Sequence, residues 1–223
     1  MTGRVAGEIA VRPPAQRPYD QALQLGFATL LARGPDAAAL LALGACAEPG
    51  AISLPVLNRT FRVNLARREV QVASAGRARP AWAVLVVHYL CADAVAPDGR
   101  EVSFGYFSDC RSYLSVFGQR IVGRFLATTG RTAAQFAQRS DQLGGTRRPA
   151  PGLRYRFDLL PRVPLDLVRY EGDAEMDPGA SVLYRADAER LLPAEDRVVA
   201  AELLLDTLAG KPMTENGGPD EGR

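Results

Sequence analysis

The residues of this chain that are best suited to chemistry are few, and the first two lie close together. His88 is the only histidine in the 223 residues, so any imidazole chemistry depends on it. Cys91 follows three residues later, which on a helix places both side chains on one face. Such a pair could supply two metal ligands, or one axial ligand to a tetrapyrrole. The alternative, which we favour, is a structural histidine whose ring nitrogens bond to neighbouring backbone.

A second candidate is an acidic loop. Asp173 and Glu175, with Asp177 close by, form the densest group of carboxylates in the chain. Oxygen-rich loops can bind Mg²⁺ or Ca²⁺, or perform acid–base work. The spacing does not match an EF-hand loop, and three acids among glycine and proline are typical of a solvated turn. Asp173 and Glu175 are therefore candidate ligand-binding residues, with a solvated turn as the alternative.

The remaining candidates have simpler explanations. Glu195 and Asp196 stand where acids stabilise the first turn of a helix. Cys110 stands beside Arg111 at a predicted helix start, and both the helix start and the arginine would lower the pKa of its thiol. The chain has no second histidine that could activate this thiol. Ser103 has no GxSxG motif around it. Residues 144–148 lack the spacing of a phosphate-binding loop and are better explained as a linker.

The composition excludes several classes of protein. The three cysteines have no CxxC spacing, which argues against a disulfide framework and a closed zinc or iron–sulfur site. The net charge of +2 comes with scattered arginines, so we expect no nucleic-acid partner. No stretch approaches the roughly 18 apolar residues of a membrane span. The amino terminus also lacks the apolar stretch of a signal peptide, so the expected location is the cytoplasm.

These residues must be positioned by a mixture of helices and strands. Apolar periodicity predicts helices over 19–33, 36–46, 82–92, 113–126, 132–143 and 194–208. Alternating patterns predict strands within 52–72 and at 102–104, 153–160, 163–170 and 181–184. The segment 82–92 is apolar on every side. Its β-branched residues leave a buried strand as the alternative, but its length favours a helix.

The order of these elements predicts one domain. We expect a single α+β domain over 18–210, in which small antiparallel sheet segments pack with about five to six helices. Residues 1–17 are predicted to be a loose arm and residues 211–223 a disordered tail. Within the domain, the glycine-rich segment 144–151 is the best candidate for a hinge.

Several segments, taken in order, resemble one family. They are Val87-His88-Tyr89-Leu90, Glu101-Val102-Ser103-Phe104, Leu160-Pro161-Arg162-Val163-Pro164, Gly172-Asp173-Ala174-Glu175, Val182-Leu183-Tyr184 and Leu192-Pro193-Ala194-Glu195-Asp196. Together they resemble the uncharacterised prokaryotic family called domain of unknown function 3786, over about residues 19–208. Some relatives look as if they carry an added iron–sulfur domain of a kind also seen in corrinoid proteins. The resemblance therefore implies a link to corrinoid or redox metabolism. This chain has no cysteine run, so it holds no iron–sulfur cluster by itself.

We therefore expect a cytoplasmic accessory protein that binds a small molecule or cofactor. Its cleft would be formed by the His88 segment and the Asp173–Glu175 loop. The first alternative is an enzyme in which Asp173 or Glu175 is the general base and His88 is an acid or a ligand. The second alternative is a protein-interaction module in which these residues are structural. The sequence assigns no ligand, reaction or oligomeric state.

Overall fold

Two antiparallel five-stranded sheets form the framework of the molecule. The computed structural model describes residues 17–34 and 36–215. The first sheet runs in the order β1 (Cys46–Glu48), β2 (Ala51–Val56), β3 (Arg59–Asn64), β4 (Glu69–Val72) and β5 (Gly76–Arg77). The second runs in the order β6 (Glu101–Ser103), β10 (Gly179–Arg185), β9 (Val163–Tyr170), β8 (Leu153–Leu160) and β7 (Thr146–Arg148).

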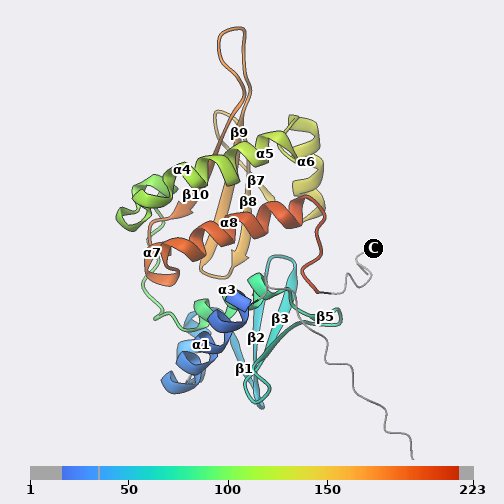
Figure 1. The fold of residues 1–223 in the computed structure, drawn as a ribbon. Coiled ribbons are helices and arrows are strands. Elements are labelled where there is room, and N and C mark those ends of the chain that lie inside the picture. Colours follow the sequence, from blue (N-terminus) through green and yellow to red (C-terminus); the bar gives the residue numbers. More distant parts are fainter. Residues whose placement is uncertain (1–16, 35, 216–223) are drawn as a thin grey trace, which may run out of the picture.

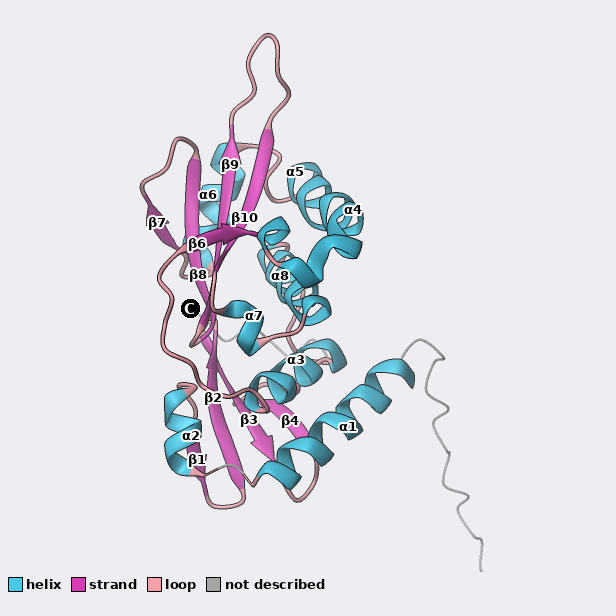
Figure 2. Ribbon diagram, turned by 90° about the vertical axis from the view of Figure 1, so that its left-hand side faces the viewer, coloured by secondary structure: helices cyan, strands magenta, loops and turns pink. Residues whose placement is uncertain are grey.

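Most helices lie on one side of the two sheets, which meet end to end (Figures 1 and 2). The helices are α1 (Arg17–Arg33), α2 (Ala37–Ala42), α3 (Pro80–Leu90), α4 (Leu114–Phe117), α5 (Arg124–Ala127), α6 (Ala133–Gln142), α7 (Ala188–Leu191) and α8 (Ala194–Leu208). The predicted α+β class is confirmed. Helices α4 and α5 belong to one helical run, joined by a π-helical turn over Gly118–Gly123. Among the described residues, no helix is both long and apolar enough to cross a membrane.

Helix α3 is the apolar centre of the fold. Its residues from Trp82 to Val87 are all buried, together with Tyr89 and Leu90. Pro80 starts the helix at a position where its missing N–H costs nothing. The ring of Trp82 packs on Phe61 of the first sheet, with centroids 5.8 Å apart. The helix interpretation of 82–92 is thus confirmed, because α1, α8 and the first sheet cover an element that is apolar all round.

Helix α8 connects the two halves of the molecule, one built on the first sheet and the other on the second sheet. It packs beside the second sheet, where the Tyr184 hydroxyl donates to the Arg197 carbonyl oxygen at 2.8 Å. It also contacts α3, so the buried residues of both halves form one continuous core. Helix α8 therefore belongs to the core of each half.

A connecting segment, residues 210–215, follows α8 along the first sheet. Gly210 ends the helix with φ +84°, a conformation that favours glycine. The Arg79 N–H then donates to the Met213 carbonyl at 2.8 Å, and the Glu215 N–H donates to the Arg77 carbonyl at 3.0 Å. The first residues of the predicted tail, 211–215, therefore pack beside β5. The rest of the predicted tail and nearly all of the predicted arm lie outside the described residues.

A buried charge cluster lies on the second sheet; we call it the Asp166 cluster. Asp166 of β9 is 2% exposed and accepts hydrogen bonds from Arg154 and Arg156 of the neighbouring strand β8. The distance from Arg156 Nε to Asp166 Oδ1 is 2.8 Å. Glu101 of β6 pairs with the same two arginines. Two cations and two carboxylates thus neutralise each other where the sheet meets solvent.

The prediction of a continuous loop over residues 144–151 is wrong in part. Residues 146–148 form strand β7, which pairs with β8. Gly145 is there because a side chain would not fit: a Cβ would lie 2.6 Å from the Phe157 ring. Gly144 and Gly145 allow a tight turn onto β7 at the edge of the sheet. The sequence analysis had inferred a mobile segment at this position.

Candidate functional site

His88 lies where three helices meet, and both its ring nitrogens face protein acceptors. Its Nδ1 donates to Asp196 Oδ2, in the first turn of α8, at 2.7 Å. The pKa of His88 is raised above its ordinary value of 6.5, chiefly because the Asp196 carboxylate accepts this hydrogen bond. The carbonyl of Ala22 on α1 acts in the same direction. The imidazole therefore links α1, α3 and α8, and coordinating a metal would require breaking one of these bonds.

Gly26 makes this junction possible. A Cβ at Gly26 would lie 2.9 Å from Val87 Cγ1 and 3.2 Å from His88 Cδ2. The Cys91 thiol donates to the Gly26 carbonyl at 3.5 Å, and burial raises its pKa. Helix α1 thus approaches α3 closely only because residue 26 has no side chain.

Replacing Gly26 by valine should therefore destabilise the protein. The added carbons must displace Val87 or the His88 ring, and overpacking of this kind costs about 2 kcal/mol. Denaturant unfolding of the variant measures the loss. Gly99→Val is the matched control, because no atom lies within 4 Å of a Cβ at that position. Equal stabilities of the two variants would contradict the close helix contact.

The acidic loop lies at the far end of the molecule from His88. The loop joins β9 to β10 and projects beyond the second sheet (Figure 1). The neighbour of His88, Tyr89, has its hydroxyl near the Arg162 backbone at the other end of β9. The eight residues of β9 span roughly 26 Å. The structure therefore does not bring His88 together with Asp173 and Glu175, and a cleft shared by them is not formed.

The carboxylate of Asp173 is used within its own loop. Its Oδ1 accepts the backbone N–H groups of Glu175 and Met176, each at 2.9 Å, and these bonds lower the pKa of Asp173. The Asp173 N–H donates to the Met176 carbonyl at 2.9 Å. This is the geometry of an exposed turn. In the part of the chain that the structure describes, no three His, Cys, Asp or Glu residues are placed to hold a metal ion.

The surroundings of Cys110 do not suit a nucleophilic thiol. Its side chain is fully buried, and burial raises the pKa of the thiol even though Arg197 lies 3.2 Å away. The guanidinium of Arg197 is itself wholly buried, stacked over the Phe107 ring and bonded to the Leu192 carbonyl. This group of residues fixes the start of α8 against the 3₁₀ turn over Ser108–Tyr113.

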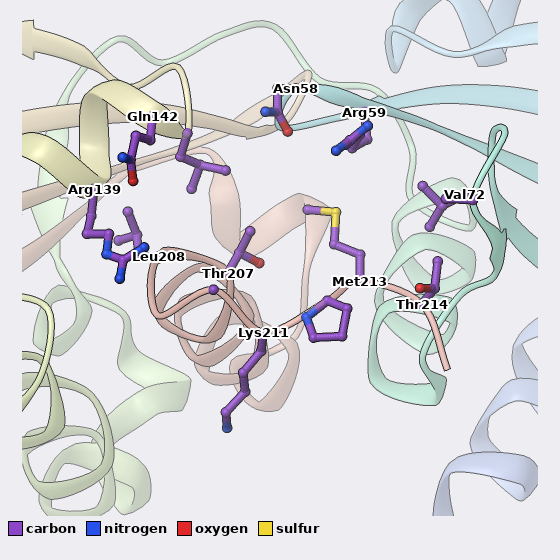
Figure 3. A pocket seen from close by; sticks show the side chains of 14 residues that line it. Asn58, Arg59, Val72, Arg139, Gln142, Thr207, Leu208, Lys211, Met213 and Thr214 are labelled. Carbon is purple, nitrogen blue, oxygen red and sulfur yellow. The ribbon is translucent and has the colours of Figure 1, made fainter. Parts of the chain in front are cut away.

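A cavity lies between the two halves of the molecule, and sequence reasoning missed it. It has a volume of about 510 Å³, within the range of small-molecule sites. The turn between β2 and β3, the turn after β4, the ends of α6 and α8, and the connecting segment surround it (Figure 3). Its lining residues are Asn58, Arg59, Val72, Ala75, Arg139, Gln142, Leu143, Thr207, Leu208, Gly210, Lys211, Pro212, Met213 and Thr214.

The charge of this cavity is positive. The lining residues include Arg59, Arg139 and Lys211, and no carboxylate is among those described. Helices α6 and α8 both end at the cavity, and each helix end carries about half a negative charge. Together the helix ends offset roughly one of the three positive charges, so the cavity favours an anion.

A carboxylate just behind the cavity wall does not reverse this balance. Asp206 of α8 pairs with Arg79, Arg124 and Lys211, so three cations surround one carboxylate. These hydrogen bonds lower the pKa of Asp206 in spite of its burial. Arg79 precedes α3 and Arg124 lies in α5, so Asp206 also links the two halves.

Comparison with known proteins gives one result. The model of a family described as "Domain of unknown function (DUF3786)" matches residues 35–207. This range includes α3, all of α8 but its last residue, and most of the cavity lining, but ends before the connecting segment. The searches of curated proteins and of solved structures each gave no match.

Proposed function

Because this chain belongs to the family described as "Domain of unknown function (DUF3786)", to which no activity is attached, we propose a function from the cavity itself: the protein binds a small organic anion. The observation that carries this proposal is a cavity of about 510 Å³ with three cationic side chains and no described carboxylate in its wall. The proposal retains the role of a cytoplasmic small-molecule-binding protein that we expected from the sequence. The proposed binding site, however, is the cavity and not the His88 segment.

The shape and composition of the lining support binding of an organic anion. Val72, Leu143, Leu208 and Met213 contribute apolar side chains to the lining, and Arg59, Arg139 and Lys211 contribute the cations. Small-molecule sites combine mostly apolar walls with a few oriented polar groups in this way. A tetrapyrrole held by His88 is not part of the proposal, because both ring nitrogens already face acceptors. Nor does the proposal include acid–base chemistry by His88 with Asp173 or Glu175, since these residues lie apart.

Hexanoate and its neutral analogue hexanamide test the proposal. Hexanoate should raise the melting temperature of the full chain and hexanamide should not, because only the carboxylate can pair with the cavity cations. Arg139→Gln should weaken hexanoate binding roughly tenfold, the loss expected for one charged hydrogen bond. Calorimetric titration measures this loss.

Arg147→Gln is the matched control for this experiment. Arg147 lies on the exposed strand β7 and does not line the cavity, so its replacement should leave hexanoate binding unchanged. Equal binding of hexanoate and hexanamide, or binding of neither, would exclude the anion-binding function. An equal loss in the two arginine variants would place the binding site elsewhere.

A further inference from the structure

The connecting segment forms one side of the cavity. Residues 210–214 all line it, and Figure 3 shows Lys211, Met213 and Thr214 around it. The side chain of Met213 also belongs to the continuous core of the molecule. A ligand in the cavity would therefore contact this segment as well as α6, α8 and the first sheet.

The connecting segment lies beside β5 and is attached there by few bonds. The two backbone hydrogen bonds described above join Arg79 to Met213 and Glu215 to Arg77. The guanidinium of Arg79 adds a hydrogen bond to the Pro212 carbonyl at 3.2 Å. The contact resembles a short added strand, and it depends on the stretch that leads from β5 into α3.

The two ends of the segment are held unequally. At its start, the Lys211 N–H donates to the Asp206 carbonyl at 2.9 Å, and Lys211 Nζ donates to the Asp206 carboxylate at 3.0 Å. At its other end, the Glu215 carboxylate lies 3.8 Å from Arg77, and both side chains are partly exposed. Such a pair adds little stability. The segment is therefore fixed where it leaves α8 and weakly held where it lies beside β5.

This weak attachment predicts local opening. Only Met213 and Thr214 of the segment are buried, whereas eight of the eleven residues of α3 are. Segments with few buried side chains and few hydrogen bonds open at a lower free energy than the core does. A ligand in the cavity contacts the closed segment, and a ligand that binds one of two states more tightly shifts the equilibrium toward that state.

Resting on the function proposed above, we propose that the connecting segment closes the cavity over its ligand. In the unliganded protein, residues 212–215 leave β5 and return to it, while Lys211 keeps the start of the segment on α8. A bound anion packs against Met213 and holds the segment closed. Ligand binding and docking of the segment are thus one coupled equilibrium.

Hydrogen exchange of the full chain, followed by NMR with and without hexanoate, tests this proposal. Without ligand, the Arg79 N–H should be protected at least tenfold less than that of Ala78, which donates to Val70 of β4 and not to the segment. Hexanoate at 100 times its dissociation constant should slow exchange at Arg79 and Glu215 by 10- to 100-fold. The Asp173 N–H, bonded within the distant acidic loop, should be unaffected.

Glu215→Pro loosens the segment without altering the cavity wall. Glu215 is not among the lining residues, and proline removes the N–H that donates to Arg77. Without ligand, exchange at Arg79 should rise about fivefold, the factor that corresponds to one hydrogen bond. Glu215→Ala is the matched control, because it keeps this N–H, and its exchange at Arg79 should stay within about twofold of the wild type. A melting curve shows that each variant is folded.

The outcomes separate this proposal from the anion-binding function. If calorimetry detects hexanoate binding but exchange at Arg79 and Glu215 does not slow, the closing segment is excluded and the anion-binding function stands. Equal protection of Arg79 and Ala78 in the unliganded protein would also exclude it, because the segment would then open only together with the core. Absence of hexanoate binding would overturn both proposals.

Discussion

Asp166→Asn is expected to lower the free energy of unfolding by about 3–5 kcal/mol. Asp166 is 2% exposed and accepts hydrogen bonds from Arg154 and Arg156. Asparagine keeps the shape but removes the charge, so two arginines of a buried cluster share only the partly exposed Glu101. For a chain of this size the loss corresponds to a fall in melting temperature of roughly 6–20 °C. Denaturant unfolding and a thermal scan measure both quantities.

Glu101→Gln is the matched control for the Asp166 cluster. Glu101 contacts the same two arginines, but its side chain is 31% exposed, so water can replace its hydrogen bonds. A loss of about 1 kcal/mol or less is expected. If the two variants were equally stable, the burial of Asp166 would not be what makes the cluster important.

His88→Ala is expected to cost about 2–3 kcal/mol without changing binding in the cavity. The variant leaves the Asp196 carboxylate, whose side chain is 8% exposed, without its imidazole donor. It also removes the link from α3 to α1 and α8. His88 does not line the cavity, so hexanoate affinity should be unchanged. Denaturant unfolding gives the first quantity and calorimetric titration the second.

The contribution of His88 should depend on pH in a defined direction. Because the pKa of His88 is raised on folding, its charged form stabilises the native state fully below its ordinary value of 6.5. That stabilisation is lost as the pH rises through the higher folded pKa. The stability gap between the wild type and His88→Ala should therefore be widest below pH 6.5 and should narrow as the pH rises above it.

Asp196→Asn provides the control for this pH effect. It should weaken the pH dependence and, combined with His88→Ala, should add little further loss, because both changes remove one interaction. A gap between wild type and His88→Ala that widens with rising pH would contradict the hydrogen bond as the source of the effect.

Elements with a strong local pattern could be predicted from the sequence. The length of the apolar run at 82–92 outweighed its β-branched residues, and α3 is a helix. The alternation of Phe61 and Val63 with polar neighbours predicted a strand, and both side chains are fully buried in β3. The family resemblance is confirmed as well, because it depended on ordered local segments.

Contacts between distant segments could not be predicted in this way. Asp196 was explained as an acid in the first turn of a helix, which it is, but its bond to His88 spans 108 residues. Gly144 and Gly145 were interpreted as a hinge because glycine permits both mobility and close packing. Only the position of the Phe157 ring shows that packing applies at Gly145.

The cavity is the clearest example of a feature that depends on contacts between distant segments. Its lining comes from four separate stretches of the chain, near residues 58, 73, 140 and 210. None of these stretches has a motif, and Arg139 near the end of α6 resembles an ordinary helix-stabilising charge. The site exists only because the first sheet, α6 and α8 converge, so local sequence patterns contain no signal for it.

The dependence of α3 on α8 has a consequence for how the chain is made. Ribosomes release the amino-terminal half first, so α3 emerges while one of its covering helices has not been synthesised. About 120 residues separate the ends of the two helices, which corresponds to roughly 6–24 s of translation. During that interval an almost wholly apolar helix has an uncovered face. Newly made chains should therefore be clients of ribosome-associated chaperones until α8 is released.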